Sequence, residues 1–263
     1  MEHPTASEQF FWENNGYLVL DSFLPSDLLA RLVETSKRAI AERRRKQEEG
    51  LPTTGMTHLN GESTRIFYIL DDDPLFLDMM TYPPLMPYVT TLLNAKPHHH
   101  ASDLIVEYPQ QGRGMGWHID GHDNGYRNLR FPIPHLQLKV GYYLNDMTEL
   151  GRGNLCVIPG SHKTQIAPDS ADLQKTELFE GAIQVCAPAG SAVLFHNALW
   201  HSGGPWTQTD GARWMLYYAY EHPWMIGSQE HWGYPPSFYN RLTPEQRSLF
   251  HGFVFDPPEA RWG

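Results

Sequence analysis

The chain has 263 residues, of which 41% are hydrophobic and 19% charged, so it can bury a full core and is not expected to be disordered. Its net charge of −10 disfavours a nucleic-acid partner, which would call for a basic surface, and no apolar run is long enough for a membrane helix. Two cysteines are too few for a disulfide framework, and the start of the chain lacks the features of a signal peptide, so we expect a cytoplasmic protein.

The first fifth of the chain is typical of helices with one strand between them. A short helix is expected over 7–14 and a strand over 17–20, where the sequence is YLVL. Ser26 is a suitable N-cap for a longer helix from Asp27 to about Gln47. The apolar side chains of that helix form a single stripe that can pack on a core: Leu28, Leu29, Leu32, Val33 and Ile40.

The next segment alternates between expected loops and regular elements. Residues 48–63 are rich in Gly, Thr and Pro, and a loop of this length in a compact domain is often a lid or a binding segment. A strand is expected over 65–70 and a helix over 85–94. The run His98–His100 is interpreted as a loop, because three adjacent side chains cannot all face one ion from a strand or a helix.

From residue 103 onward the sequence changes to short strands separated by Gly and Pro turns. This pattern predicts a sandwich, jelly roll or barrel. The fold class expected is therefore mainly β with flanking helices, around a double-stranded β-helix (jelly-roll, cupin-like) core. We expect one domain over 1–263, made of N-terminal helices (about 7–47), the core (about 65–222) and an extension (223–263). The strands are expected at 103–108, 135–144, 154–158, 182–186, 191–195 and 213–221.

The sequence His118-Ile-Asp120 is a candidate for part of a metal site. On a strand, positions i and i+2 face the same side, so an imidazole and a carboxylate could bind one ion. Fe(II) oxygenases use two histidines and one carboxylate on one face of an octahedron and leave three positions open. A lone H-x-D pair is also common on ordinary surface strands, so it needs a third ligand from elsewhere in the chain.

His201 is the candidate third ligand, and Arg213 follows it by twelve residues at the start of an expected strand. In a jelly roll, these two positions can flank one cavity. The guanidinium of Arg213 could bind the distal carboxylate of 2-oxoglutarate while the 2-oxo acid end chelates iron. An isolated arginine would otherwise be a surface ion-pair residue. His196 is the rival to His201 as the third ligand.

Several further residues could line such a cavity. Gln137 and Lys139 alternate with apolar neighbours, so they share one face of their strand, which is either the interior of the barrel or an exposed polar side. In the interior they could bind the dicarboxylate. Candidate substrate contacts are the side chains of Arg65, Tyr108, Trp117 and Trp200.

The combined pattern resembles the phytanoyl-CoA dioxygenase-like branch of the 2-oxoglutarate oxygenases. The resemblance rests on the H-x-D pair, PGSHK (159–163), HxxxxHSGGP (196–205) and Arg213, and extends over about 7–222. The opening FFWENNGYLVLDSFLP and the segment YYLNDMTELGRGNLCVIPGSH are also similar to the family. By this resemblance, iron is bound by His118, Asp120 and His201, and 2-oxoglutarate by Arg213, while the hydroxyl of Ser202 could add a hydrogen bond.

The resemblance implies an Fe(II)- and 2-oxoglutarate-dependent dioxygenase. Such an enzyme consumes dioxygen, releases succinate and CO2, and hydroxylates or otherwise oxidises an unactivated C–H bond of a small-molecule metabolite. Residues 121–135 depart from the family members with CoA-ester or zwitterionic substrates, so the substrate does not carry over, and the oligomeric state is open. A metal-dependent cupin-type isomerase or hydrolase, which would not need Arg213, and a non-catalytic metal-binding barrel are the alternatives.

Overall fold

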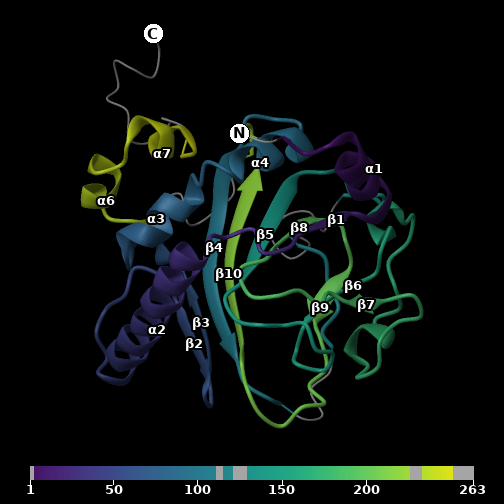
Figure 1. Ribbon diagram of the computed structural model, residues 1–263, viewed down its shortest axis with the longest axis horizontal. Helices are drawn as coiled ribbons and strands as arrows, with labels where there is room; N and C mark the ends of the chain where they lie inside the picture. The colour runs from purple at the N-terminus through teal and green to yellow at the C-terminus, as the bar shows by residue number, and fades with distance from the viewer. Residues whose placement is uncertain (1–2, 111–114, 121–128, 226–232, 251–263) are drawn as a thin grey trace.

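A computed structural model describes residues 3–110, 115–120, 129–225 and 233–250. Two antiparallel sheets form the centre of the molecule (Figure 1). In the order of pairing, the larger sheet contains β1 (Tyr17–Leu20), β8 (Ala192–His196), β5 (Gln137–Tyr143), β10 (Arg213–Glu221), β4 (His98–Glu107), β3 (Ser63–Phe67) and β2 (Thr57–Asn60). The smaller sheet contains β7 (Ile183–Gln184), β6 (Leu155–Val157) and β9 (His201–Gly203).

Helices cover the face of the large sheet that points away from the small one. Helix α1 begins with a capping box between Thr5 and Glu8 and ends at Gly16, whose φ of 78° is left-handed and suits glycine. No helix among the described residues combines the length and the apolar composition needed to cross a bilayer. The α-helices of the described residues are α1 (Ala6–Asn15), α2 (Ser26–Glu48), α3 (Pro74–Met80), α4 (Met86–Leu93), α6 (Pro236–Asn240) and α7 (Pro244–Ser248).

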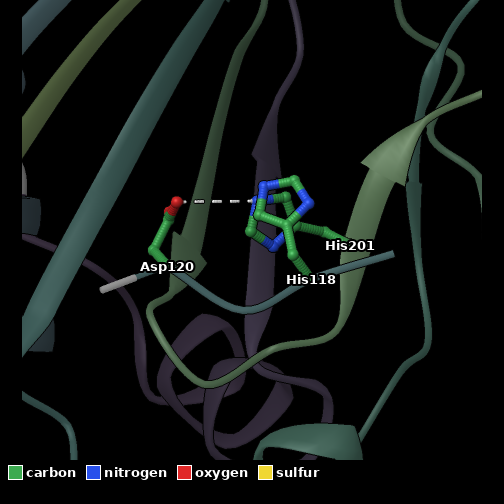
Figure 2. Close-up of side chains that lie close together, drawn as sticks. All are labelled: His118, Asp120 and His201. Carbon is green, nitrogen blue, oxygen red and sulfur yellow. Dashed lines mark ion pairs between the residues drawn. The ribbon is translucent and has the colours of Figure 1, made fainter. Parts of the chain in front are cut away.

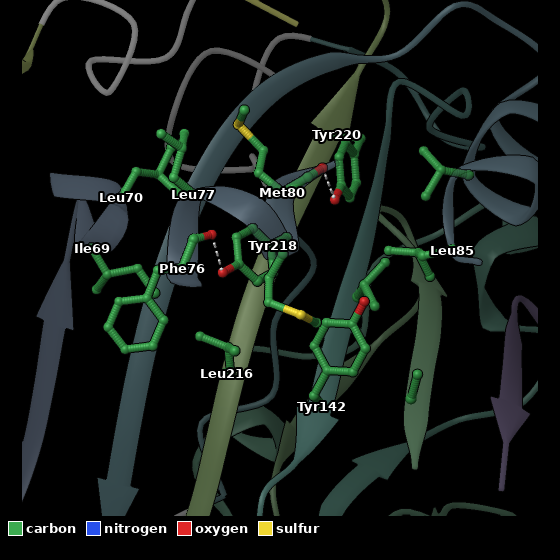
Figure 3. Close-up of a cluster of buried hydrophobic side chains, with 14 of the residues drawn as sticks. Ile69, Leu70, Phe76, Leu77, Met80, Leu85, Tyr142, Leu216, Tyr218 and Tyr220 are labelled. Atoms are coloured by element: carbon green, nitrogen blue, oxygen red, sulfur yellow. Dashed lines mark hydrogen bonds between the residues drawn. The ribbon is translucent and has the colours of Figure 1, made fainter. Parts of the chain in front are cut away.

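Alternation along β10 divides the core into two layers. Tyr218 and Tyr220 face the helices, where their hydroxyls donate hydrogen bonds to the carbonyl oxygens of Phe76 (2.7 Å) and Met80 (2.9 Å) in α3 (Figure 3). Tyr217 faces the other way and packs in the layer between the two sheets. The period of two therefore leaves one face of β10 for the hydrophobic core and the other for a cavity.

The expected fold class, a mainly β jelly roll with flanking helices, is confirmed by this arrangement. The apolar stripe of α2 packs as expected, with Leu32 and Ile40 buried in the main core. The expected capping role of Ser26 is wrong: α2 begins at Ser26 itself, and Pro25 precedes it without a side-chain capping bond. The expected helix over 85–94 is α4.

Three expected loops or strands need correction. Residues 48–63 contain the strand β2, which pairs with β3 at the edge of the large sheet. The strand expected over 65–70 ends at Phe67, and a short 3₁₀ turn follows at Ile69–Asp71. The histidine run 98–100 begins strand β4, since its backbone pairs with the end of β10.

Candidate metal centre

Backbone pairing brings the three candidate ligands together. His118 and His201 exchange two backbone hydrogen bonds of 3.0 Å, so the segment that carries the H-x-D pair lies directly beside β9. The amide of Asp120 donates to the carbonyl oxygen of Asn197 (2.8 Å), which anchors the same segment one step further on. One nitrogen from each of the two histidines and one carboxylate oxygen then lie within 4.8 Å of one another (Figure 2).

The hydrogen bonds of both imidazole rings leave the same nitrogen available for a metal. Nδ1 of His118 lies 2.9 Å from the carbonyl oxygen of Gly116, and Nδ1 of His201 lies 2.9 Å from that of Leu199. A carbonyl oxygen can only accept, so each Nδ1 carries the hydrogen and each Nε2 keeps its lone pair. The two rings lie side by side with Asp120 opposite them, 3.8 Å from Nε2 of His201 (Figure 2).

The charge states of the site also suit a divalent cation. Burial lowers the pKa of His201 to about 3, so this ring is neutral at physiological pH. Burial alone would raise the pKa of Asp120, but the positive charge of Lys139, with smaller effects of His201 and His118, holds it below its usual range. Two imidazole nitrogens and one carboxylate are the donor set that non-haem Fe(II) prefers.

One oxygen of the metal-site carboxylate has no partner. Oδ2 of Asp120 is buried and accepts no hydrogen bond from the described residues, whereas Oδ1 lies 3.4 Å from Nζ of Lys139. A buried carboxylate oxygen without a donor is costly, and a metal ion would satisfy it. The residues present therefore fit an iron ion.

A cavity of about 400 Å³ opens beside these ligands. Its wall on the large sheet carries three cationic side chains from β3, β5 and β10, and an acidic residue accompanies each one. Arg213 is buried at the start of β10, so its charge is strongly shielded from water. The pairs are Arg213 with Glu107 at 2.5 Å, Arg65 with Asp103 at 2.6 Å and Lys139 with Asp120 at 3.4 Å.

Seven of the residues singled out in the sequence line this one cavity: His118, Asp120, His201, Arg213, Lys139, Arg65 and Ser202. Lys139 faces the interior, as the alternation along its strand allowed. The hydroxyl of Ser202 is engaged, because it donates to the backbone carbonyl oxygen of Met115. Ser202 therefore lines the cavity, but its hydroxyl is already hydrogen-bonded to the segment that carries His118 and Asp120.

Four other candidates lie elsewhere, contrary to expectation. Gln137 is buried but does not line the cavity. Trp117 and Trp200 pack together with other apolar residues in a separate hydrophobic cluster, and Tyr108 packs against the main core. The positions of Trp117 and Trp200 next to ligands in the sequence are explained by packing rather than by contact with the cavity.

His196, the rival third ligand, lies in a different cluster. Its ring stacks on His135 with the centroids 4.2 Å apart, and its Nδ1 accepts a hydrogen bond from the amide of Ala198. It is absent from the group of side chains that could bind a metal. The geometry therefore favours His201.

The sequence reasoning missed the acidic residues of the cavity. Asp103, Ile105 and Glu107 share one face of β4. Ile105 and Glu107 line the cavity, and Asp103 pairs with Arg65 of its wall. The alternation that identified Lys139 could have found them. Residues 121–128, the greater part of the segment 121–135 that departs from the family members with known substrates, lie outside the described residues.

Comparisons with known proteins show which family and fold this chain is similar to. The family model for phytanoyl-CoA dioxygenase (PhyH) matches residues 12–214. A probable phytanoyl-CoA dioxygenase of Caenorhabditis elegans is 25% identical over 231 residues, which cover 80% of this chain and 72% of the relative.

Two proteins of known structure share this fold. EctD from S. alaskensis, solved without metal and with bound iron, has a TM-score of 0.67 at 22% identity and covers 84% of this chain and 78% of its own. A further structure of EctD contains 2-oxoglutarate and 5-hydroxyectoine. The non-haem α-ketoglutarate-dependent carbocyclase SnoK from nogalamycin biosynthesis has a TM-score of 0.63 at 18% identity, with 92% of both chains covered.

Proposed function

Because this chain belongs to the phytanoyl-CoA dioxygenase family, we propose that it is an Fe(II)- and 2-oxoglutarate-dependent oxygenase that hydroxylates a small molecule. The observation that carries the proposal is the convergence of His118, Asp120, His201 and Arg213 on one cavity. EctD and SnoK, which share the fold, are described with iron or with 2-oxoglutarate dependence, and this supports the same pair of cofactors here.

His118, Asp120 and His201 would hold the iron on one side and leave its other side to the cavity. When bound there, iron would supply the chemistry by which dioxygen oxidises 2-oxoglutarate to succinate and CO2, coupled to oxidation of a substrate C–H bond. Related halogenases lack the carboxylate ligand and use its position for chloride. The presence of Asp120 therefore favours hydroxylation over halogenation. Its charge is maintained by Lys139, so the ligand is ready to bind without a prior loss of a proton.

Arg213 would bind the distal carboxylate of 2-oxoglutarate. Its guanidinium faces the cavity, is buried, and its Nε has no hydrogen-bond partner among the described residues. A planar fork of donors in a shielded site binds a carboxylate strongly and in a fixed orientation. Binding there would align the 2-oxo acid end of the cosubstrate with the metal ligands.

The size and polarity of the cavity support a small, polar substrate. A volume of about 400 Å³ must hold the cosubstrate as well, and charged side chains line much of its wall. Arg65, at the mouth of the cavity with 41% of its side chain exposed, is the proposed substrate contact.

The direct test is a succinate assay with Fe(II)-loaded protein, 2-oxoglutarate, dioxygen and a library of small polar metabolites. We expect slow succinate release without a substrate and faster release with the right one. The Asp120→Ala variant, which lacks one ligand, should release none. Binding of a metal without binding or consumption of 2-oxoglutarate would contradict the proposal and favour a metal-dependent isomerase or hydrolase.

A further inference from the structure

We propose that Glu107 is an internal competitor for the cosubstrate: its carboxylate occupies Arg213 until 2-oxoglutarate binds and returns to it as succinate leaves. This inference rests on the proposed function, since it concerns the same carboxylate anchor. It assigns a role to an acidic side chain that the binding of iron and 2-oxoglutarate does not itself require.

The pair is built into the large sheet. Arg213 and Glu107 are directly opposite each other in the register of β10 and β4. Nη2 of Arg213 lies 2.5 Å from Oε2 of Glu107, and the two side chains are 5% and 17% exposed. A buried cation needs a nearby anion, and in this structure the chain itself provides one.

Two carboxylates cannot use this guanidinium independently. The distal carboxylate of 2-oxoglutarate would approach the same positive charge that Glu107 already neutralises. Like charges a few ångströms apart repel strongly where water is largely excluded. Glu107 must therefore move away from Nη2 or share it at a cost in affinity, so its charge weakens cosubstrate binding.

The structure leaves a way in for the competing carboxylate. Gly203 faces the pair, and a Cβ at this position would lie 3.5 Å from Nη2 of Arg213 and 3.7 Å from Oε2 of Glu107. The missing side chain keeps that side of the pair open to the cavity. Nε of Arg213 still lacks a hydrogen-bond partner among the described residues, so the guanidinium keeps donor capacity for a second acceptor.

Succinate would compete with Glu107 for Arg213 in the same way, because it keeps the distal carboxylate of 2-oxoglutarate. Return of Glu107 to Arg213 would replace the contact that the product loses on leaving. Glu107 would thus weaken the binding of cosubstrate and product alike, which favours release of succinate after each turnover.

The cavity offers a matched control. Asp103 also lies on β4, is buried, and pairs with an arginine at 2.6 Å, but its partner is Arg65 on the neighbouring strand β3. An effect of general negative charge in the cavity would appear on neutralising either acid. Competition at the anchor would appear only on neutralising Glu107.

The test compares ligand binding to wild type, Glu107→Gln and Asp103→Asn by calorimetry, with Fe(II) and without oxygen. We expect Glu107→Gln to bind 2-oxoglutarate and succinate about tenfold more tightly, because the glutamine keeps the shape but not the charge. Asp103→Asn should bind both as wild type does. Without ligand, Glu107→Gln should melt at a lower temperature, and 2-oxoglutarate should raise its melting temperature more than that of wild type.

A second uncharged variant, Glu107→Ser, should also gain affinity and serves if glutamine disturbs the fold. Unchanged or weaker 2-oxoglutarate binding in both Glu107 variants would overturn the inference and make Glu107 a support for Arg213. Equal gains in Glu107→Gln and Asp103→Asn would overturn it as well. If iron-loaded wild type and all variants fail to bind 2-oxoglutarate, the proposed function itself is wrong, and the inference falls with it.

Discussion

Lys139 and Gln137 show what a pattern of single residues can and cannot reveal. Alternation along β5 correctly put Lys139 on the inner face, where Nζ lies 3.4 Å from the carboxylate of Asp120 and 5.3 Å above the ring of Tyr217. Gln137 shares that face but pairs in register with Glu221, two positions further along the strand. The period of two predicts which face of a sheet a side chain lies on, but not how far along the strand the cavity extends. It therefore could not predict that Lys139 lines the cavity and Gln137 does not.

At the metal ligands, we expect His201→Ala and Asp120→Ala to lose the bound iron. Each removes one of three donors, and the remaining two cannot hold Fe(II) through desalting. His196→Asn should keep one iron per chain, because His196 lies in the neighbouring histidine stack. Metal content after desalting measures this, and loss of iron in His196→Asn with retention in His201→Ala would reverse the assignment.

At the anchor, Arg213→Ala should raise the 2-oxoglutarate requirement at least about tenfold, because a charged contact of this kind is worth ~1.5–3 kcal/mol. The variant also leaves Glu107 facing the cavity without its cation, which adds repulsion. Iron content should not change. A 2-oxoglutarate dependence equal to that of wild type would make Lys139 or Arg65 the anchor.

Among the elements, long segments with a clear period were predictable and short ones were not. Helices α1, α2 and α4 and most strands after residue 100 followed from periodicity and turn residues. Strand β2 is mostly exposed and lies at the sheet edge, so no apolar alternation marks it. The start of β4 was missed because the histidines of 98–100 are fixed by a distant residue: His98 and His100 flank the buried carboxylate of Glu221 at 3.3 and 2.6 Å.

One buried side chain of helix α2 binds the segments before β2 and after the 3₁₀ turn Ile69–Asp71. Arg43, 1% exposed, binds Asp72 through Nε (2.8 Å) and Nη2 (2.9 Å) and donates to the carbonyl oxygen of Gly55 (2.6 Å). Arg43→Ala should lower the free energy of unfolding by ~3–5 kcal/mol, since it removes a fully buried cation and takes from the half-buried carboxylate of Asp72 its ion-pair partner. Arg45→Ala, which breaks only surface ion pairs, should cost far less in the same denaturation experiment. Equal losses would contradict this account.

The contact between α1 and β8 should be sensitive to acid. His196 is 7% exposed, and burial lowers its pKa to about 2, against about 6.5 in an unfolded chain. Between these values the unfolded chain binds a proton that the folded chain does not. The free energy of unfolding therefore falls as the pH drops below about 6.5, by up to ~1.4 kcal/mol per pH unit from this side chain.

Denaturation at about pH 7 and about pH 5 checks this expectation. His196→Asn should lose less stability between the two pH values than wild type does, whatever its stability at neutral pH. The control His58→Asn, at an exposed position of β2, should show the wild-type pH dependence. An unchanged pH dependence in His196→Asn would show that the buried ring does not govern acid stability.

For the whole molecule, the site depends on contacts between segments far apart in the sequence. The H-x-D segment, β9 and β10 supply the four residues of the site, and only the fold brings them around one cavity. The local sequence pattern could identify these residues as candidates, and the resemblance to a family could assign them to one site. Neither predicted the ion pair between Arg213 and Glu107. That pair follows from the register of β4 against β10, which no local pattern encodes.

The most direct test of the central claim is an anaerobic titration of the iron-loaded protein with 2-oxoglutarate, followed by visible absorption. A 2-oxo acid that chelates ferrous iron gives a weak visible charge-transfer band. We predict that this band appears and saturates at one 2-oxoglutarate per chain in wild type, needs far more 2-oxoglutarate in Arg213→Ala, and is absent in Asp120→Ala. Iron-loaded wild type that shows no band at any 2-oxoglutarate concentration would contradict a shared site for iron and cosubstrate.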